Sequence, residues 1–209
     1  LPPELSVHKT ILHGFMPISS FKEITKVDGP VIYEIDGKPA FDVLNDIFGD
    51  KNGSPIEDEL SLIMTLGKKY GDQMAPYDES VYVNRLIVNT NPDDGSVMLF
   101  EADFNQGTQV QIMTRDNKLM LESVRTRSKE LLQSVNSSST VGGFYIDCAG
   151  RSSAFTGTEM EDAEILQKQW NADIPLFGFY SGVELAPLLG RTQPLDWTGV
   201  LNIFTVESS

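Results

Sequence analysis

Short stretches of the chain alternate apolar and polar positions or are rich in β-branched and aromatic residues, and both patterns are typical of strands. Turn sequences separate several of them, among them Asp36-Gly37 and Asn91-Pro92-Asp93-Asp94-Gly95. We predict that the three stretches between residues 82 and 113 pair as an antiparallel meander. The predicted strands are residues 8–12, 24–27, 31–35, 82–89, 97–104, 108–113, 143–148, 176–180 and 197–206.

Three other stretches carry helix signals. Pro39 suits a first helical turn, an apolar stripe follows it through Phe48, and Gly49 suits a C-terminal cap. Leu121, Val124, Ser128, Leu131 and Val135 recur at helical spacing, which predicts an amphipathic helix of roughly 20 residues.

A third helix is predicted from a capping box of Thr158 and Glu161 through about Trp170, and its acidic first turn (residues 159–162) suits the helix dipole. Residues 54–57 also carry helix-start signals, whereas residues 62–66 resemble a strand, so that boundary stays open. We predict an α+β fold in which about three helices pack on a mainly antiparallel mixed sheet.

Composition and charge exclude several classes of protein. Apolar residues make up 40% of the 209 residues, enough for a sizeable core. The net charge is −14, and the densest basic stretch, Arg125, Arg127 and Lys129, fits a solvated helix face. A chain of this charge repels phosphate backbones and anionic lipids, so we expect no nucleic-acid or membrane partner.

No apolar run is long enough to span a membrane, and no signal peptide is visible. Cys148 is the only cysteine, which rules out an intrachain disulfide and fits a reducing compartment. We therefore expect a cytoplasmic protein. Because the chain begins at Leu1 without a methionine, it can be a fragment of a longer protein.

The first candidate binding segment is Asp147-Cys148-Ala149-Gly150-Arg151, where a predicted strand enters a glycine-containing turn and presents an arginine. Free backbone N–H groups beside an arginine suit a carboxylate or a phosphate. The alternative is that Cys148 is a small core residue and that Arg151 is ion-paired or lies at the surface.

The second candidate segment is Phe177-Gly178-Phe179-Tyr180-Ser181-Gly182-Val183-Glu184. Its glycines let a ligand approach the backbone closely, while Tyr180 and Ser181 supply hydroxyl groups and Glu184 can hold an ammonium. The alternative is a strand that leaves the core, with Tyr180 hydrogen-bonded locally and Glu184 solvated.

Catalytic and metal sites find little support. The two histidines, His8 and His13, lie near the N-terminus, and the chain has no G-x-S-x-G, phosphate-loop or G-x-G-x-x-G sequence. One cysteine and two histidines cannot make a structural zinc site without carboxylates. We predict no catalytic residues, no metal and no cofactor. A cysteine-dependent hydrolase is the remaining enzyme alternative, and it requires an exposed, rapidly alkylated Cys148.

The two candidate segments resemble the C-terminal part of the FIST family, in which a C-x-G-R segment precedes a P-x-x-G-F-Y segment and a glutamate. Here these are Cys148-Ala149-Gly150-Arg151, Pro175-Leu176-Phe177-Gly178-Phe179-Tyr180 and Glu184. Upstream, Tyr33-Glu34-Ile35-Asp36-Gly37-Lys38-Pro39-Ala40 is similar to a family element with a D-G-k-P-A core. Further similarity at Val83-Asn84-Arg85-Leu86, Gly107-Thr108-Gln109-Val110 and Trp197-Thr198-Gly199-Val200-Leu201 extends the resemblance over about residues 20–206.

The resemblance implies a sensory, signal-transducing domain and no enzyme. Its partners would be a small ligand, such as an amino acid or small organic acid, and an output domain such as a histidine kinase or diguanylate cyclase. Residues 1–30 would be the tail of a FIST N-terminal domain or linking strands, and residues 31–209 the ligand-binding domain. The predicted ligand-binding residues are Cys148, Gly150, Arg151, Gly178, Tyr180, Ser181 and Glu184.

In this hypothesis Arg151 meets a ligand carboxylate and Glu184 an ammonium or hydroxyl, while Tyr180 and Ser181 orient the ligand. The alternative is a protein-interaction module or homodimer without a small ligand, marked by a large exposed apolar patch. For that alternative the helix at residues 121–135 is the expected contact face.

Overall fold

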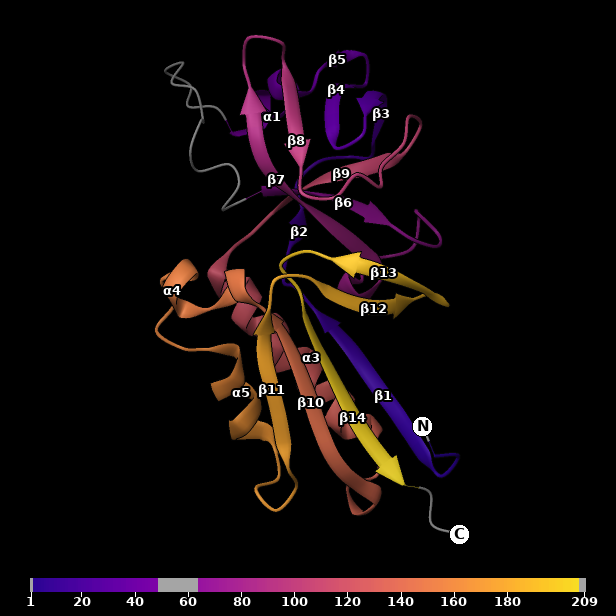
Figure 1. Cartoon of the computed structure of the whole chain (residues 1–209), viewed down its shortest axis with the longest axis vertical. Coiled ribbons are helices and arrows are strands. Elements are labelled where there is room, and N and C mark those ends of the chain that lie inside the picture. The colour runs from indigo at the N-terminus through magenta and orange to yellow at the C-terminus, as the bar shows by residue number, and fades with distance from the viewer. Residues whose placement is uncertain (1, 49–63, 207–209) are drawn as a thin grey trace. The chain divides into compact units, whose positions relative to one another are not determined.

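The computed structural model describes residues 2–48 and 64–206, and the predicted features at Gly49, at residues 54–57 and at 62–63 lie outside this range. The chain forms two compact units (Figure 1). Unit 1 comprises residues 1–14, 78–80 and 116–209, and unit 2 comprises residues 15–77 and 81–115. The domain division predicted near residue 30 concerns the extent of the family's domains and stays a prediction.

Unit 2 is an antiparallel sheet that closes because its first and last main strands pair with each other. The order of its main strands is β9-β3-β4-β8-β7-β6, and β6 pairs in turn with β9. Its elements are β2 (Met16–Pro17), β3 (Lys22–Asp28), β4 (Val31–Ile35), β5 (Lys38–Pro39), α1 (Ala40–Phe48), β6 (Met64–Lys69), β7 (Tyr82–Asn91), β8 (Ser96–Leu99) and β9 (Gln109–Thr114).

The predicted meander is half wrong. Strands β7 and β8 pair as an antiparallel hairpin across the predicted turn, but β9 pairs with β6 and β3 and not with β8. The reason is that β4 occupies the other edge of β8, where Val31 lies opposite Met98. Strand β8 also ends at Leu99, earlier than predicted, and Phe104 enters the core from the following loop.

Helix α1 confirms the apolar stripe predicted after Pro39. Ala40, Phe41, Val43 and Leu44 are buried and join a core cluster with side chains from the strands of unit 2, such as Ile24. Burial of these apolar side chains is the main stabilising contribution of the helix, since nine residues would be marginal alone.

Unit 1 is a four-stranded sheet in the order β1-β14-β10-β11. The pairs β1–β14 and β14–β10 are antiparallel, whereas β10 and β11 are parallel. A β12–β13 hairpin, which the sequence did not predict, lies between β11 and β14 along the chain. The elements are β1 (Leu5–Leu12), α3 (Asn117–Ser134), β10 (Thr140–Cys148), α4 (Ser153–Thr156), α5 (Asp162–Gln169), β11 (Leu176–Ser181), β12 (Glu184–Leu188), β13 (Arg191–Leu195) and β14 (Gly199–Val206).

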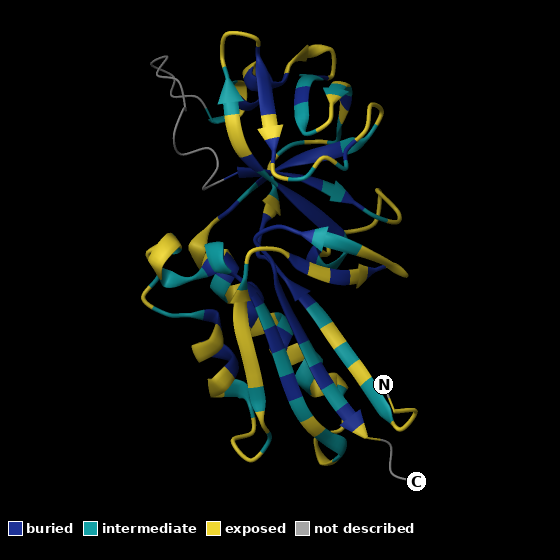
Figure 2. Cartoon of the chain, viewed as in Figure 1, coloured by how far each residue is buried: buried dark blue, intermediate teal, exposed yellow. Residues whose placement is uncertain are grey.

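Helices α3 and α5 cover one face of this sheet. Val124 of α3 and Leu166 of α5 pack in one apolar cluster with Tyr145, Leu201 and Ile203 of the strands. The opposite face carries no helix from the described residues, and β11 is exposed along its length (Figure 2). Together the units confirm the predicted α+β class with a mainly antiparallel, mixed sheet.

The capping prediction for α5 was wrong by one turn. Glu161, not Thr158, is the N-cap, and the backbone N–H of Glu161 donates to Glu164 Oε1 at 3.3 Å. The Thr158 hydroxyl instead bonds to the Thr156 hydroxyl at 2.7 Å, in the turn that follows α4. No helix of the described residues is long and apolar enough to cross a membrane.

Candidate functional site

The parallel pairing of β10 and β11 places the two candidate segments side by side. Tyr145 lies opposite Gly178, Asp147 opposite Tyr180, and Cys148 opposite Ser181. Parallel neighbours need a crossover connection, and here the chain makes it through α4 and α5. Helix α5 therefore runs beside the edge strand β11, next to both segments.

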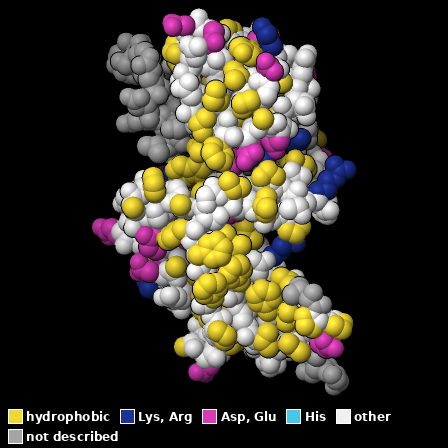
Figure 3. Space-filling model, viewed as in Figure 1, with side chains coloured by type: hydrophobic (Ala, Val, Ile, Leu, Met, Phe, Trp, Pro, Cys, Tyr) yellow, Lys and Arg dark blue, Asp and Glu magenta, His cyan; other side chains and the backbone are white. Residues whose placement is uncertain are grey.

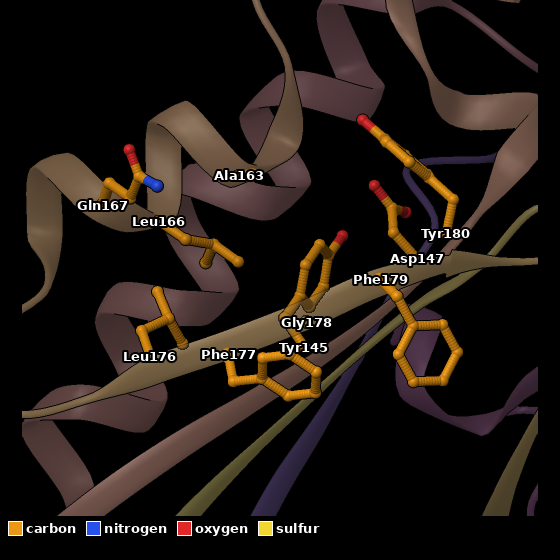
Figure 4. Close-up of a pocket in the computed structure, with 10 residues that line it drawn as sticks. All are labelled: Tyr145, Asp147, Ala163, Leu166, Gln167, Leu176, Phe177, Gly178, Phe179 and Tyr180. Atoms are coloured by element: carbon orange, nitrogen blue, oxygen red, sulfur yellow. The ribbon is translucent and has the colours of Figure 1, made fainter.

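A cavity of about 360 Å³ lies between α5 and β11. Figure 4 shows Tyr145, Asp147 and Tyr180 on the same side of β11 as Leu166 and Gln167 of α5. The lining is mostly apolar, with Asp147 as its charged residue. The lining residues are Tyr145, Asp147, Ala163, Leu166, Gln167, Leu176, Phe177, Gly178, Phe179 and Tyr180.

Gly178 has a packing reason to be glycine. A Cβ atom at this position would overlap the backbone carbonyl oxygen of Tyr145 on the neighbouring strand. By contrast, a Cβ atom at Gly182 would meet no other atom within 4 Å. The sequence predicts that a ligand approaches the backbone closely at Gly178, but strand β10 makes this close approach. Gly178 also forms part of the cavity wall.

Arg151 lies behind the cavity, fully buried in a network of acceptors. Its Nε and Nη2 donate to Asp162 Oδ2 at 2.9 and 2.7 Å, and Nε lies 3.1 Å from Asp147 Oδ1. Its Nη1 donates to the carbonyl oxygens of His13 and Trp197 at 3.1 and 3.3 Å. The guanidinium is thus engaged on every side, and its direct contact with a ligand stays a prediction.

Asp147 has an unusual protonation equilibrium. Burial and the charge of Asp162 together raise the pKa of its carboxyl to about 7, against the opposing charge of Arg151. Tyr145, whose hydroxyl donates to Asp162 at 3.0 Å, has its pKa raised well above the usual value by burial and by the same aspartate. The cavity wall thus contains a carboxyl group that titrates near neutrality.

Tyr180 closes the other end of the cavity. Its hydroxyl donates to Glu161 Oε2 at 2.6 Å, and Ser153 Oγ donates to Glu161 Oε1 at 2.5 Å. Burial and the bond to Glu161 raise the pKa of Tyr180. This contact joins the edge strand to the start of α5, so Tyr180 both lines the cavity and ties its two walls together.

Glu184 and Cys148 form a second buried pair outside the cavity lining. Glu184 is only 1% exposed, and among the described residues no donor meets hydrogen-bond geometry at either carboxylate oxygen. Burial raises its pKa to about 8, although the Cys148 thiol and the Thr198 N–H lie near enough to lower it. The alternative of a solvated Glu184 is therefore wrong, because this side chain is buried beside Cys148 and Thr198.

Cys148 is 8% exposed, and burial together with the charge of Glu184 raises the pKa of its thiol to about 11. Ser181 bonds locally, its Oγ donating to the Val183 carbonyl at 2.7 Å. Gly150 lies against the Trp197 ring, which a Cβ atom would approach to 3.4 Å. Of the predicted ligand-binding residues, only Gly178 and Tyr180 line the cavity.

The sequence model of the FIST C domain family matches residues 40–187, which include both candidate segments. The chain belongs to the FIST C domain family. This is a family of sensory-type domains, and the resemblance drawn from the sequence motifs is confirmed.

The FIST C domain also has uncharacterized curated relatives. One, from Mycobacterium tuberculosis, is 26% identical over 205 residues, covering 98% of this chain and 52% of that protein. Another, from Mycobacterium bovis, is 24% identical over 197 residues, covering 93% of this chain and 49% of that protein. The chain thus spans about half the length of the curated relatives it matches. No solved structure matches it.

The sequence missed three groups at the site of this FIST C domain, namely Tyr145, Glu161 and Asp162, and gave no role to Asp147, which begins the first candidate segment. Tyr145 and Asp147 are two residues apart in a strand and so share one face, a signal that was present in the sequence. The acidic run at residues 159–162 was interpreted only as a first helical turn, because its contacts with Tyr145, Arg151 and Tyr180 depend on the fold.

Proposed function

We propose that this FIST C domain is a sensory domain that binds a small organic ligand in the cavity between α5 and β11. The observation that carries the proposal is the cavity itself. Its volume of about 360 Å³ suits a small ligand, and its largely apolar wall contains a few polar groups that can fix orientation. A buried carboxyl with a strongly raised pKa, here Asp147, is the kind of group that marks functional sites.

In this proposal the predicted residues have different tasks. Gly178 and Tyr180 form part of the wall, and Asp147 contacts the ligand. Arg151 is a positioning residue, since its ion pairs hold Asp147 and Asp162 in place. The other four predicted residues lie outside the cavity lining and stabilise the ends of β10 and β11. They are Cys148, Gly150, Ser181 and Glu184.

Signalling would depend on the fact that the two walls of the cavity belong to different secondary-structure elements. One wall is the short helix α5 and the other is the edge strand β11, and the described contact between Tyr180 and Glu161 already joins them. A ligand that contacts both walls stabilises the arrangement in which they are joined, and so shifts a conformational equilibrium. The output domain, such as a histidine kinase or diguanylate cyclase, and the cytoplasmic location belong to this proposal.

A thermal-shift screen of small organic compounds tests the proposal, with one variant that fills the cavity and one control. Ala163→Phe places a ring at the cavity wall, whereas Lys168→Phe adds the same ring to α5 outside the lining. A ligand at about 100 times its dissociation constant stabilises the fold by about 2.7 kcal/mol. We expect this stabilisation to persist in Lys168→Phe and to disappear in Ala163→Phe. Stabilisation that survives in Ala163→Phe would place binding elsewhere and contradict the proposal.

A second candidate function, a protein-interaction module, is favoured by the helix-free face of the unit 1 sheet. Phe177 and Phe179 are 65% and 50% exposed there, and both rings pack against Phe144. Figure 3 shows hydrophobic side chains gathered over this sheet. The helix that the sequence proposed as the contact face instead directs its apolar side chains, including Leu131, into the core.

Sedimentation over a wide concentration range distinguishes the two functions. An interaction module that pairs with itself would dimerise as concentration rises, and Phe177→Ser with Phe179→Ser would abolish dimerisation. A chain that remains monomeric at high concentration counts against self-association through this face.

A further inference from the structure

The hydroxyl groups that line the cavity offer lone pairs and no protons. The Tyr180 hydroxyl donates its proton to Glu161, a carboxyl whose pKa is lowered by its hydrogen bonds from Ser153 and Tyr180 despite partial burial. The Tyr145 hydroxyl donates to Asp162 Oδ2, an oxygen that also accepts from Arg151. A phenol has a single proton. Both phenol oxygens can therefore act only as acceptors toward a ligand.

The charged groups around the cavity are mainly negative, which also suits a ligand that donates hydrogen bonds. Asp147 is the charged residue of the lining, and no lysine or arginine is among the lining residues that the structure describes. Behind the wall, Arg151 is shared between Asp147 and Asp162. Glu161 adds a further negative charge beyond Tyr180. Carboxylates thus outnumber cations at this cavity.

The N-terminus of α5 does not reverse this balance. A free helix N-terminus attracts anions through its unpaired N–H groups. Here the side chains of Glu161 and Glu164 form a capping box, which pairs the N–H groups of these two residues, and Asp162 adds a third carboxylate to the same turn. Lys168, the basic residue of α5, lies in the last turn with its Nζ 3.8 Å from Met160 Sδ, and it is not part of the lining.

We infer that the cavity selects a small organic cation, an ammonium group on an apolar tail, and rejects amino acids and organic acids. The ammonium donates to the Asp147 carboxylate and the two phenol oxygens, and the tail lies against Leu166 and Leu176. A ligand carboxylate would enter a site without an available cation, which costs binding free energy. This inference rests on the proposed function and narrows its ligand class. The net charge of −14 favours the approach of cations over long distances.

Two matched series of compounds test the inference by isothermal titration calorimetry on the whole chain. One series is isopentylamine, leucine and isocaproate, and the other is phenethylamine, phenylalanine and hydrocinnamate. Within each series the tail is shared, and the compounds carry the ammonium, both charged groups, or the carboxylate. We expect at least one of the two amines to bind, about tenfold or more tightly than its amino acid and its acid.

Asp147→Asn and Tyr180→Phe are expected to weaken amine binding, by about tenfold for the aspartate because a charge-assisted contact is lost. Asp173→Asn is the control, because it removes the same charge from an exposed position outside the lining. Asp147→Asn can destabilise the fold through its contact with Arg151, so the partly exposed Tyr180→Phe provides an independent test. Amine affinity unchanged in Tyr180→Phe and in a folded Asp147→Asn would overturn the inference.

The outcomes separate this inference from the proposed function. Binding of an acid or amino acid in preference to its amine, lost in Ala163→Phe, would overturn the cation inference and leave the ligand cavity standing. Failure of both amines to bind would overturn the cation inference. Amine binding that Ala163→Phe leaves unchanged would overturn both, because the ligand would then lie outside the cavity.

Discussion

Arg151 donates two hydrogen bonds to a single oxygen of Asp162, from Nε and Nη2 to Oδ2 at 2.9 and 2.7 Å, and both side chains are fully buried. These residues belong to the turn after β10 and the start of α5, so the pair fixes the helix beside the strand. Removing one partner of a buried pair leaves an uncompensated charge, a larger cost than the net contribution of the intact pair.

Arg151→Ala is therefore expected to destabilise the fold by about 3–5 kcal/mol, measured by urea denaturation. Arg125→Ala is the control, because its pair with Glu122 at 2.6 Å is exposed to solvent and contributes little to stability. A ligand-binding defect of Arg151→Ala is meaningful only under conditions in which the variant is folded. Equal stability of Arg151→Ala and the parent chain would contradict the buried network.

Gly178→Ala is expected to destabilise the protein by about 1–3 kcal/mol, because the added methyl group overlaps the Tyr145 carbonyl and pushes β11 from β10. Gly182→Ala adds the same methyl group in open space and is expected to change stability by less than about 0.5 kcal/mol. Thermal unfolding of both variants checks the difference. A tolerated Gly178→Ala would show that β11 is not held against β10 at this register.

The thiol of Cys148 is expected to react slowly with iodoacetamide in the folded protein. Burial and the neighbouring Glu184 raise its pKa to about 11, so little thiolate exists near neutral pH. The rate should rise sharply when urea unfolds the chain, followed by mass spectrometry. Fast modification of the folded protein would instead favour the cysteine-dependent hydrolase alternative.

Stability is expected to fall by about 1 kcal/mol between about pH 7 and 9 because of Glu184. Its folded pKa of about 8 lies above the ordinary value of 4.5, so the native state binds the proton more tightly than the unfolded chain does. The resulting stabilisation is complete below the ordinary pKa and is lost as pH rises through about 8. Asp147, with a pKa of about 7, contributes to the loss at the start of this range.

Urea denaturation at several pH values in this range measures the effect. His13 has a lowered pKa, mainly through burial, and the stability it contributes is lost on acidification, outside the chosen range. Glu184→Gln keeps the shape of the side chain without its titration and should flatten the pH dependence. An unchanged slope in Glu184→Gln would assign the dependence to another group.

The sequence by itself determined those elements whose buried face is visible as a local periodicity of apolar residues. The apolar stripe of α1, the spacing of Val124 and Ser128 in α3, and the β7–β8 hairpin around its turn all have the predicted form. The same local patterns carried the family motifs, because a motif is a short run of residues in order. For that reason the family and the α+β class could be predicted before the fold was known.

Only the tertiary structure decided which segments meet. Periodicity shows which face of a strand is buried but not which strand lies beside it, so neither the pairing of β6 with β9 nor the parallel β10–β11 pair could be predicted. The state of the charged residues depended on the same long-range contacts. Arg151 and Glu184 have ionisable side chains that sequence patterns place at the surface. In the fold, however, Arg151 pairs with Asp162, and Glu184 is buried beside Cys148 and Thr198. Burial of a charge is determined by partners far along the chain, and the local sequence does not contain them.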